Sequence, residues 1–140
     1  MALLTQSLQK FLLGSVLLLA SSLPPHLAQA ADAQPRVVDV KQGKSMAERG
    51  ALLLDVRELE EYQQGHAPNS RLLPLGQLNK RIAELDAYRD KPIAVICRSG
   101  RRSAQAVELL RQAGFTQVVN VQGGMNAWEA AALPVVKGKN

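Results

Sequence analysis

The 140-residue sequence contains one cysteine, Cys97, and only two histidines. These side chains cannot supply the four nitrogen and sulfur ligands of a structural zinc site, so no metal site is predicted, and no motif calls for a cofactor. Aromatic residues make up 4% of the chain, and no basic run is longer than the pair Arg101-Arg102. A nucleic-acid groove needs clustered positive charge and stacking rings. The excess of 17 Lys and Arg over 12 Asp and Glu is therefore not interpreted as a nucleic-acid surface.

Long apolar runs are also scarce, and the run near the beginning of the chain is too short to span a bilayer, which needs about 20 apolar residues. This run, Phe11 to Leu23, follows Lys10 and ends at Pro24-Pro25. Ala28-Gln29-Ala30 then has the pattern of a signal-peptide cleavage site. We expect residues 1–30 to be cleaved after Ala30, which in a bacterium makes the mature protein periplasmic and free of the membrane. An uncleaved membrane anchor is the alternative.

The rest of the chain alternates short apolar runs with amphipathic segments, a pattern typical of α/β proteins. We expect a flexible leader over 31–36, one folded domain over 37–136 and a polar tail over 137–140. Pro74 interrupts the third strand and predicts a sheet edge. Together the pattern predicts a central parallel sheet of about five strands with helices on both faces. The expected strands are 37–40, 51–56, 71–75, 93–96 and 118–121. The expected helices are 58–64, 76–88, 104–113 and 125–132, and 43–49 is expected to form a brief helix or a turn.

Cys97 follows the apolar run 93–96 and precedes an amphipathic segment that ends at Gly114. A residue at the carboxyl end of a strand and just before a helix meets backbone N–H groups that lack partners within the helix. These donors and the helix dipole favour an anion. Such settings lower a thiol pKa from about 8.5 to roughly 3.5–7.5. The sequence therefore predicts a nucleophilic thiolate, and the alternative is a buried, inert cysteine.

The residues after Cys97 support the reactive interpretation. Arg98, Arg101 and Arg102 add positive charge, and Gly100 lets the backbone fold tightly around the sulfur. In an exported protein an unpaired cysteine indicates a reactive thiol or an intermolecular partner. We expect this turn to attract small anions.

Four segments together resemble the rhodanese family, in an order and spacing that match one rhodanese domain from about residue 37 to residue 136, nearly all of the expected mature chain. They are Leu54-Asp55-Val56-Arg57-Glu58, Gly65-His66-Ala67-Pro68-Asn69-Ser70, Cys97-Arg98-Ser99-Gly100-Arg101-Arg102-Ser103 and Gly123-Gly124-Met125-Asn126-Ala127-Trp128. The exported single-domain layout is similar to small periplasmic rhodaneses. The resemblance implies a rhodanese-like three-layer sandwich.

The resemblance also implies sulfurtransferase chemistry through covalent catalysis. The Cys97 thiolate would take the outer sulfur of thiosulfate or a similar donor, and the persulfide would pass it to a thiophilic acceptor, which is cyanide, a small thiol or a protein thiol. The backbone N–H groups of the turn would hold the persulfide charge, and an arginine would bind the donor's sulfonate oxygens. The substrate-binding residues implied are Arg98, Ser99, Gly100, Arg101, Arg102 and Ser103.

Three supporting residues keep two interpretations each. Asp55 either caps a helix with Glu58 as its partner or supports the active turn. Arg57 is either a structural ion-pair partner or a substrate ligand, and His66 either fixes a turn or titrates near neutral pH. Ser103 likewise either caps the helix after the turn or polarises the donor.

Other functions fit the sequence less well. Cysteine phosphatases and arsenate reductases resemble Cys, five residues, then Arg, whereas the sixth residue after Cys97 is Ser103. The bidentate arginine for a phosphoryl group is therefore missing, and the turn is one residue too short. An intact Cys97 argues against an inactive scaffold. A persulfide carrier or redox-sensing module with poor independent turnover remains the alternative, because it would use the same cysteine.

Overall fold

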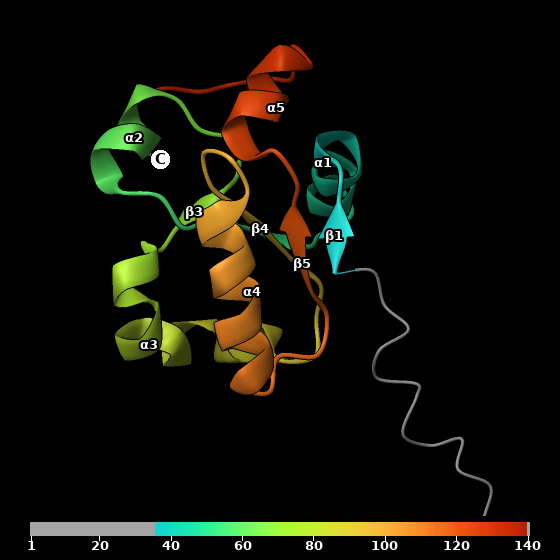
Figure 1. Ribbon diagram of the computed structural model, residues 1–140, viewed down its shortest axis with the longest axis vertical. Coiled ribbons are helices and arrows are strands. Elements are labelled where there is room, and N and C mark those ends of the chain that lie inside the picture. The colour runs from blue at the N-terminus through green and yellow to red at the C-terminus, as the bar shows by residue number, and fades with distance from the viewer. Residues whose placement is uncertain (1–35, 140) are drawn as a thin grey trace, which may run out of the picture. The chain divides into compact units, whose positions relative to one another are not determined.

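Short apolar runs form a five-stranded parallel sheet in the computed structural model, which describes residues 36–139 (Figure 1). The expected signal peptide over 1–30, most of the expected leader and Asn140 lie outside that range. The strand order is β1-β5-β4-β2-β3, so β3 lies at the sheet edge that Pro74 predicts. The strands are β1 (Val37–Val38), β2 (Leu52–Asp55), β3 (Arg71–Leu72), β4 (Ile93–Ile96) and β5 (Val118–Val121).

Helices cover both faces of the sheet, as predicted (Figure 1). α1 and α5 pack on one face, and α3, η4 and α4 pack on the other. No helix within residues 36–139 is both long and apolar enough to cross a membrane. The α-helices are α1 (Val40–Glu48), α2 (Leu59–Gln64), α3 (Leu78–Arg81), α4 (Arg101–Gln112) and α5 (Gly124–Ala130), and the 3₁₀ helices are η3 (Leu75–Gln77) and η4 (Ile82–Tyr88).

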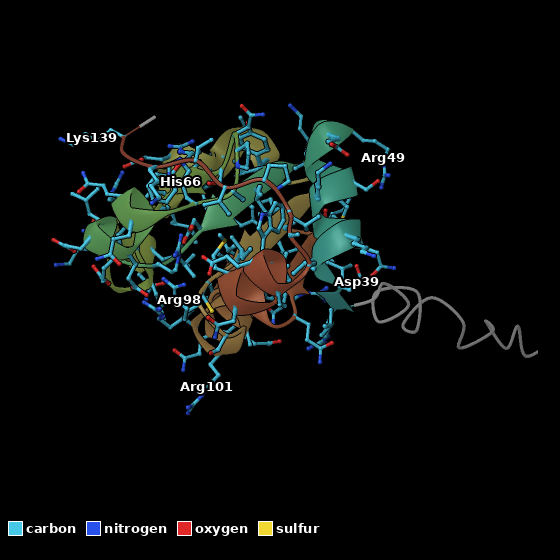
Figure 2. The ribbon with its side chains drawn as sticks, turned by 90° about the horizontal axis from the view of Figure 1, so that it is seen from above. Asp39, Arg49, His66, Arg98, Arg101 and Lys139 are labelled. Atoms are coloured by element: carbon cyan, nitrogen blue, oxygen red, sulfur yellow. The ribbon has the colours of Figure 1, made fainter. Side chains whose placement is uncertain are left out.

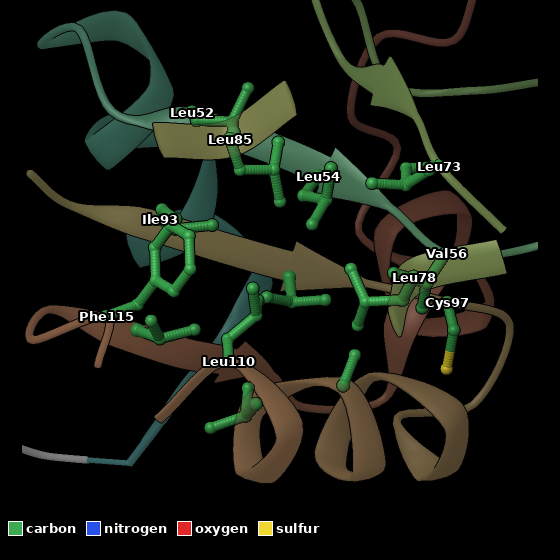
Figure 3. Packing of buried hydrophobic residues seen from close by; sticks show 14 residues of the cluster. Leu52, Leu54, Val56, Leu73, Leu78, Leu85, Ile93, Cys97, Leu110 and Phe115 are labelled. Atoms are coloured by element: carbon green, nitrogen blue, oxygen red, sulfur yellow. The ribbon is translucent and has the colours of Figure 1, made fainter. Parts of the chain in front are cut away.

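Two hydrophobic clusters, one on each face, follow from the alternation of side chains along the strands. In β4, Val95 packs in the cluster that contains Leu110 of α4, whereas Ile96 packs in the cluster that contains Trp128 of α5. Cys97 continues the Val95 side. Figure 3 shows it at the end of this cluster, with its sulfur directed toward the beginning of α4. The alternation of side chains in β4 therefore places the thiol on the face of the sheet that α4 covers.

The first expected strand is too long because Asp39 begins a helix. The Asp39 side chain accepts a hydrogen bond from the N–H of Gln42, at 2.8 Å, and the Gln42 side chain accepts one from the N–H of Asp39, at 2.9 Å. This capping box starts α1 at Val40, so the expected short helix at 43–49 begins earlier than predicted.

The expected helix over 76–88 is wrong in form. The segment folds as η3, α3 and η4 in succession. A 3₁₀ turn repeats every three residues and an α-turn every 3.6, so apolar residues spaced three and four apart suit both. Leu78 and Leu85 are still fully buried, as the periodicity predicts. The apolar pattern identified the buried face but not the kind of helix.

Candidate active site

Cys97 opens the turn between β4 and α4, which we call the Cys97 loop (residues 97–103). Gly100 is the N-cap of α4 and has φ 96°, in the left-handed region that favours glycine. This conformation turns the Gly100 N–H back to the cysteine, where it donates to Sγ at 3.1 Å. The loop therefore curls around the sulfur at the carboxyl end of the sheet, where parallel sheets bind ligands.

The surroundings of the Cys97 sulfur are polar although the residue is only 1% exposed. Burial raises the pKa of the thiol. The Ser103 hydroxyl, which can donate to the ionised sulfur, and the backbone N–H groups of Ser103, Gly100 and Ser99 lower it. The hydrogen bonds prevail, and the pKa lies below the ordinary thiol value. The Ser103 Oγ lies 3.3 Å from Sγ. An inert buried cysteine would lack these donors, so the geometry supports the reactive interpretation.

The beginning of α5 holds the Cys97 loop from the other side. The N–H of Met125 donates to the carbonyl oxygen of Cys97 at 2.8 Å, and the N–H of Asn126 donates to that of Arg98 at 3.0 Å. A Cβ on Gly124 would lie 2.3 Å from the Cys97 oxygen. Only glycine permits this approach, which explains why residue 124 is a glycine.

The three arginines near Cys97 differ in their contacts. Arg102 donates to both carboxylate oxygens of Glu61, at 2.7 and 2.8 Å, and Arg98 lies 3.7 Å from a carboxylate oxygen of Glu129. Arg101 is exposed, and Figure 2 shows it extending away from the protein. Because two of the three charges are balanced by carboxylates, hydrogen bonds rather than arginine charge are the main cause of the lowered thiol pKa.

The expectation that Asp55 caps a helix with Glu58 is wrong. Asp55 is the last residue of β2, and its carboxylate accepts hydrogen bonds from the Arg57 guanidinium at 2.7 to 3.1 Å. Both side chains are fully buried. The capping box lies three residues later, between Glu58 and Glu61. Arg57 thus has the structural ion-pair contacts that one of its two interpretations requires.

Arg57 also connects this strand end to the turn that contains His66, because its Nη2 donates to the carbonyl oxygen of Gly65 at 2.9 Å. His66 is buried and stacks on Tyr62, with ring centroids 3.7 Å apart. Its backbone pairs with Val136 in an antiparallel bridge. These contacts are those of a residue that fixes the turn.

Ser103 does not cap α4, since the N-cap is Gly100. Its hydroxyl donates instead to Oδ1 of Asn120 in β5, at 2.6 Å. Ser99 is exposed at the outer side of the Cys97 loop. The Cys97 loop therefore places Gly100 and Ser103 against the sulfur and leaves Ser99 and Arg101 exposed.

The sequence prediction missed two residues at this site, Asn120 and Glu61. Asn120 is the one polar residue in the buried run Val118–Val121, and its position pairs with Val95 of β4. The alternation of strand side chains could have assigned it to the Cys97 face. Glu61 reaches Arg102 across 41 residues of sequence, and no spacing rule relates them.

Comparisons with known proteins agree with this fold. A family model described as a rhodanese-like domain matches residues 39–131. A solved structure of a rhodanese-related protein from Thermoplasma volcanium is 38% identical, with a TM-score of 0.63, and the match covers 72% of this chain and 97% of that one.

Curated relatives carry names from sulfur chemistry. The thiosulfate sulfurtransferase GlpE of Pseudomonas savastanoi pv. phaseolicola is 37% identical over 64% of this chain and 83% of its own length. A sulfurtransferase of Allochromatium vinosum is 39% identical over 61% of this chain and 78% of its own. The putative sulfur carrier protein YrkF of Bacillus subtilis is 36% identical over 74% of this chain, which spans only 55% of that relative.

Proposed function

Because the chain belongs to the rhodanese-like domain family, we propose that it moves sulfane sulfur from thiosulfate or a similar donor to cyanide or a thiol, through a persulfide on Cys97. The observation that carries this proposal is the hydrogen-bonded sulfur. Sγ receives the Gly100 N–H at 3.1 Å and lies 3.3 Å from the Ser103 hydroxyl. These donors favour the thiolate, which is the nucleophilic form of cysteine.

Two displacements make up the proposed reaction. The Cys97 thiolate attacks the outer sulfur of thiosulfate, the sulfur–sulfur bond of the donor breaks, and sulfite leaves with the bonding electron pair. An acceptor then attacks the outer sulfur of the persulfide and releases the Cys97 thiolate. With cyanide the product is thiocyanate. No external electrons are needed in either step, and the covalent intermediate implies ping-pong kinetics.

The three arginines near Cys97 have different roles in this proposal. Arg101 is exposed, and Arg98 is held only at 3.7 Å from Glu129, so both can turn to the sulfonate oxygens. Arg102 is engaged by both oxygens of Glu61. We assign Arg102 to fixing α2 against the Cys97 loop and the other two to the donor.

The test is the mass of the protein after incubation with thiosulfate. Transfer of one sulfur should add about 32 Da, and later addition of cyanide should remove it and form thiocyanate. The Cys97→Ser variant, which has no thiol, should neither gain mass nor form thiocyanate. Wild-type protein alkylated beforehand is the matched control for folding. A mass gain that survives in Cys97→Ser would contradict the assignment of Cys97.

A sulfur carrier is the second candidate, and the 36% identity to a putative sulfur carrier protein supports it. A carrier would load one sulfur and release it only to a protein thiol, whereas an enzyme turns over with small acceptors. Thiocyanate formed per protein molecule separates them. A single equivalent indicates a carrier, and many equivalents indicate an enzyme.

We also propose that the protein is exported and works in the periplasm after cleavage between Ala30 and Ala31. The apolar run Phe11 to Leu23 and the Ala28-Gln29-Ala30 site support this proposal. Intact mass of the protein from a periplasmic fraction tests it, because the mature chain should begin at Ala31. A full-length chain recovered from the membrane fraction would indicate an uncleaved anchor.

A further inference from the structure

A closed ring of hydrogen bonds joins the Cys97 sulfur to a side chain on β5. The Gly100 N–H donates to Sγ at 3.1 Å, and the Ser103 Oγ lies 3.3 Å from Sγ. The same hydroxyl donates to Asn120 Oδ1 at 2.6 Å, and Asn120 Nδ2 donates to the carbonyl oxygen of Gly100 at 3.1 Å. Ser103 is fully buried and Asn120 is 9% exposed.

The chemistry of donors and acceptors fixes the orientation of the Asn120 amide. The Gly100 carbonyl can only accept, so it requires the amide nitrogen of Asn120. The amide oxygen must then face Ser103, and it also can only accept. The Ser103 hydroxyl has a single proton, which is therefore directed to Asn120. The lone pairs of Oγ are left for the sulfur.

We propose that Asn120 competes with the Cys97 sulfur for the single hydroxyl proton of Ser103, which makes Asn120 a positioning residue that limits how strongly Ser103 supports the thiolate. In the protonated state the S–H donates weakly to the Ser103 oxygen, and the Ser103 hydroxyl donates to Asn120. In the ionised state the hydroxyl turns to the sulfur, and Asn120 Oδ1 then faces an oxygen that no longer donates to it. Ionisation therefore breaks one buried hydrogen bond as it forms another.

Charged side chains on the elements around the sulfur do not compete for this proton. They are Arg98 of the Cys97 loop, Arg101 and Arg102 of α4, Glu61 of α2, Glu129 of α5, and Asp55 at the end of β2 with its partner Arg57. Replacing Asn120 by an uncharged residue leaves all these charges in place, so the Ser103 proton is the variable that such a substitution changes.

This inference rests on the proposed function for its role in the reaction. In the persulfide, the inner sulfur is uncharged and does not need a donor, so the hydroxyl returns to Asn120. When the acceptor removes the outer sulfur, negative charge develops on the Cys97 sulfur, and the hydroxyl turns toward it. Between the two half-reactions, Asn120 Oδ1 thus accepts the hydrogen bond that the Ser103 hydroxyl no longer donates to the sulfur.

The test is the pH dependence of Cys97 alkylation by iodoacetamide in Asn120→Leu and wild-type protein. Without the competing amide, Ser103 can donate to the thiolate permanently, and the midpoint should fall by about one pH unit, the size expected for a hydrogen bond to a charged group. A merely structural role predicts the opposite sign, because losing the bond to the Gly100 carbonyl would loosen the loop and weaken the Gly100 N–H donor.

Ser103→Ala supplies the matched background. Without a hydroxyl there is no proton to compete for, so adding Asn120→Leu to Ser103→Ala should leave the midpoint unchanged. A rise in the midpoint of Asn120→Leu, no change, or an equal fall in the Ser103→Ala background would overturn the inference. Asn120→Ala repeats the test with a smaller side chain if leucine does not fit the site.

Infrared spectroscopy tests the same inference without alkylation, because the chain has one thiol and therefore one S–H stretching band. The S–H stretching band of wild-type protein should lie at the lower frequency of a donating thiol and should rise in Ser103→Ala. A wild-type band at the position of a non-bonded thiol would overturn the inference. Neither measurement uses a sulfur donor, so both outcomes are independent of whether Cys97 loads sulfur.

Discussion

The ion pair between Glu61 and Arg102 offers the clearest test of how α2 supports the Cys97 loop. Hydrogen bonds from Arg102 lower the pKa of Glu61 from 4.5 to about 2. We consider the substitution Glu61→Gln, which removes the negative charge but keeps a side-chain oxygen. That oxygen can still accept the N–H of Glu58, now bonded to Glu61 at 3.1 Å, so the capping box of α2 is retained.

The lowered pKa of Glu61 sets an upper bound on its contribution to stability. The difference between 4.5 and about 2 corresponds to about 3 kcal/mol. The two side chains keep 33% and 29% of their surface exposed, so water screens part of this attraction. The pair is bidentate, which favours the higher end of the range for solvated pairs. We expect Glu61→Gln to lower the free energy of unfolding at neutral pH by about 1–2 kcal/mol.

The sign of the pH dependence follows from the direction of the shift. The folded pKa of Glu61 is depressed, so the folded state binds its proton less readily than the unfolded state does. The stabilisation is fully present above pH 4.5 and is lost as the pH falls through about 2. The difference between wild-type and Glu61→Gln protein should therefore be constant above that window and shrink within it.

Urea unfolding at a series of pH values measures this difference, and alkylation of Cys97 gives a second readout. With Glu61 neutral, the Arg102 charge is no longer balanced, so the alkylation midpoint should move to lower pH. Glu84→Gln is the matched control, since Glu84 pairs with Arg81 at an exposed site and should not move the midpoint. A stability difference that stays constant down to pH 2, or an unmoved midpoint in Glu61→Gln, would refute the reasoning.

Two further substitutions test how the Cys97 loop is built. Gly124→Ala should destabilise the fold by at least about 2 kcal/mol in thermal or urea unfolding, because the new Cβ would meet the Cys97 oxygen at 2.3 Å. Gly76→Ala is the control, since a Cβ at that position would have no atom within 4 Å. Equal effects of the two substitutions would contradict the explanation. Arg57→Leu should cost about 3–5 kcal/mol by leaving the buried Asp55 carboxylate unpaired; adding Asp55→Asn should recover part of the loss, and no recovery would count against a role for the charge.

The strands were predictable where burial on both sides makes the apolar run continuous. The ranges 93–96 and 118–121 agree with β4 and β5 to the residue. Helix starts were harder, because the same residue types serve several purposes. Asp55 and Glu58 have the spacing of a capping box, but Asp55 belongs to a buried strand and pairs with Arg57. Local spacing cannot reveal a side chain's burial, which depends on tertiary contacts.

The Cys97 loop itself was predictable because its parts are contiguous in sequence. A strand, a cysteine, a glycine and a helix define a turn whose N–H groups must point inward. The partners that tune the sulfur were not predictable from that turn. Glu61 lies on α2 and Asn120 lies on β5, and tertiary packing brings both residues to the site.

Two opposing effects on one sulfur explain why these distant partners matter. Burial raises the pKa of Cys97, and hydrogen bonds lower it by more. A difference between two large effects responds strongly to a small change in either. Ser103 is among the groups that lower the pKa of Cys97, and its hydroxyl is shared with Asn120. The Asn120 amide on β5 therefore influences the net shift of that pKa. Arg98 and Arg101 act from more exposed positions, where water screens them, and their charge is better suited to attracting an anionic donor than to setting the state of the thiol.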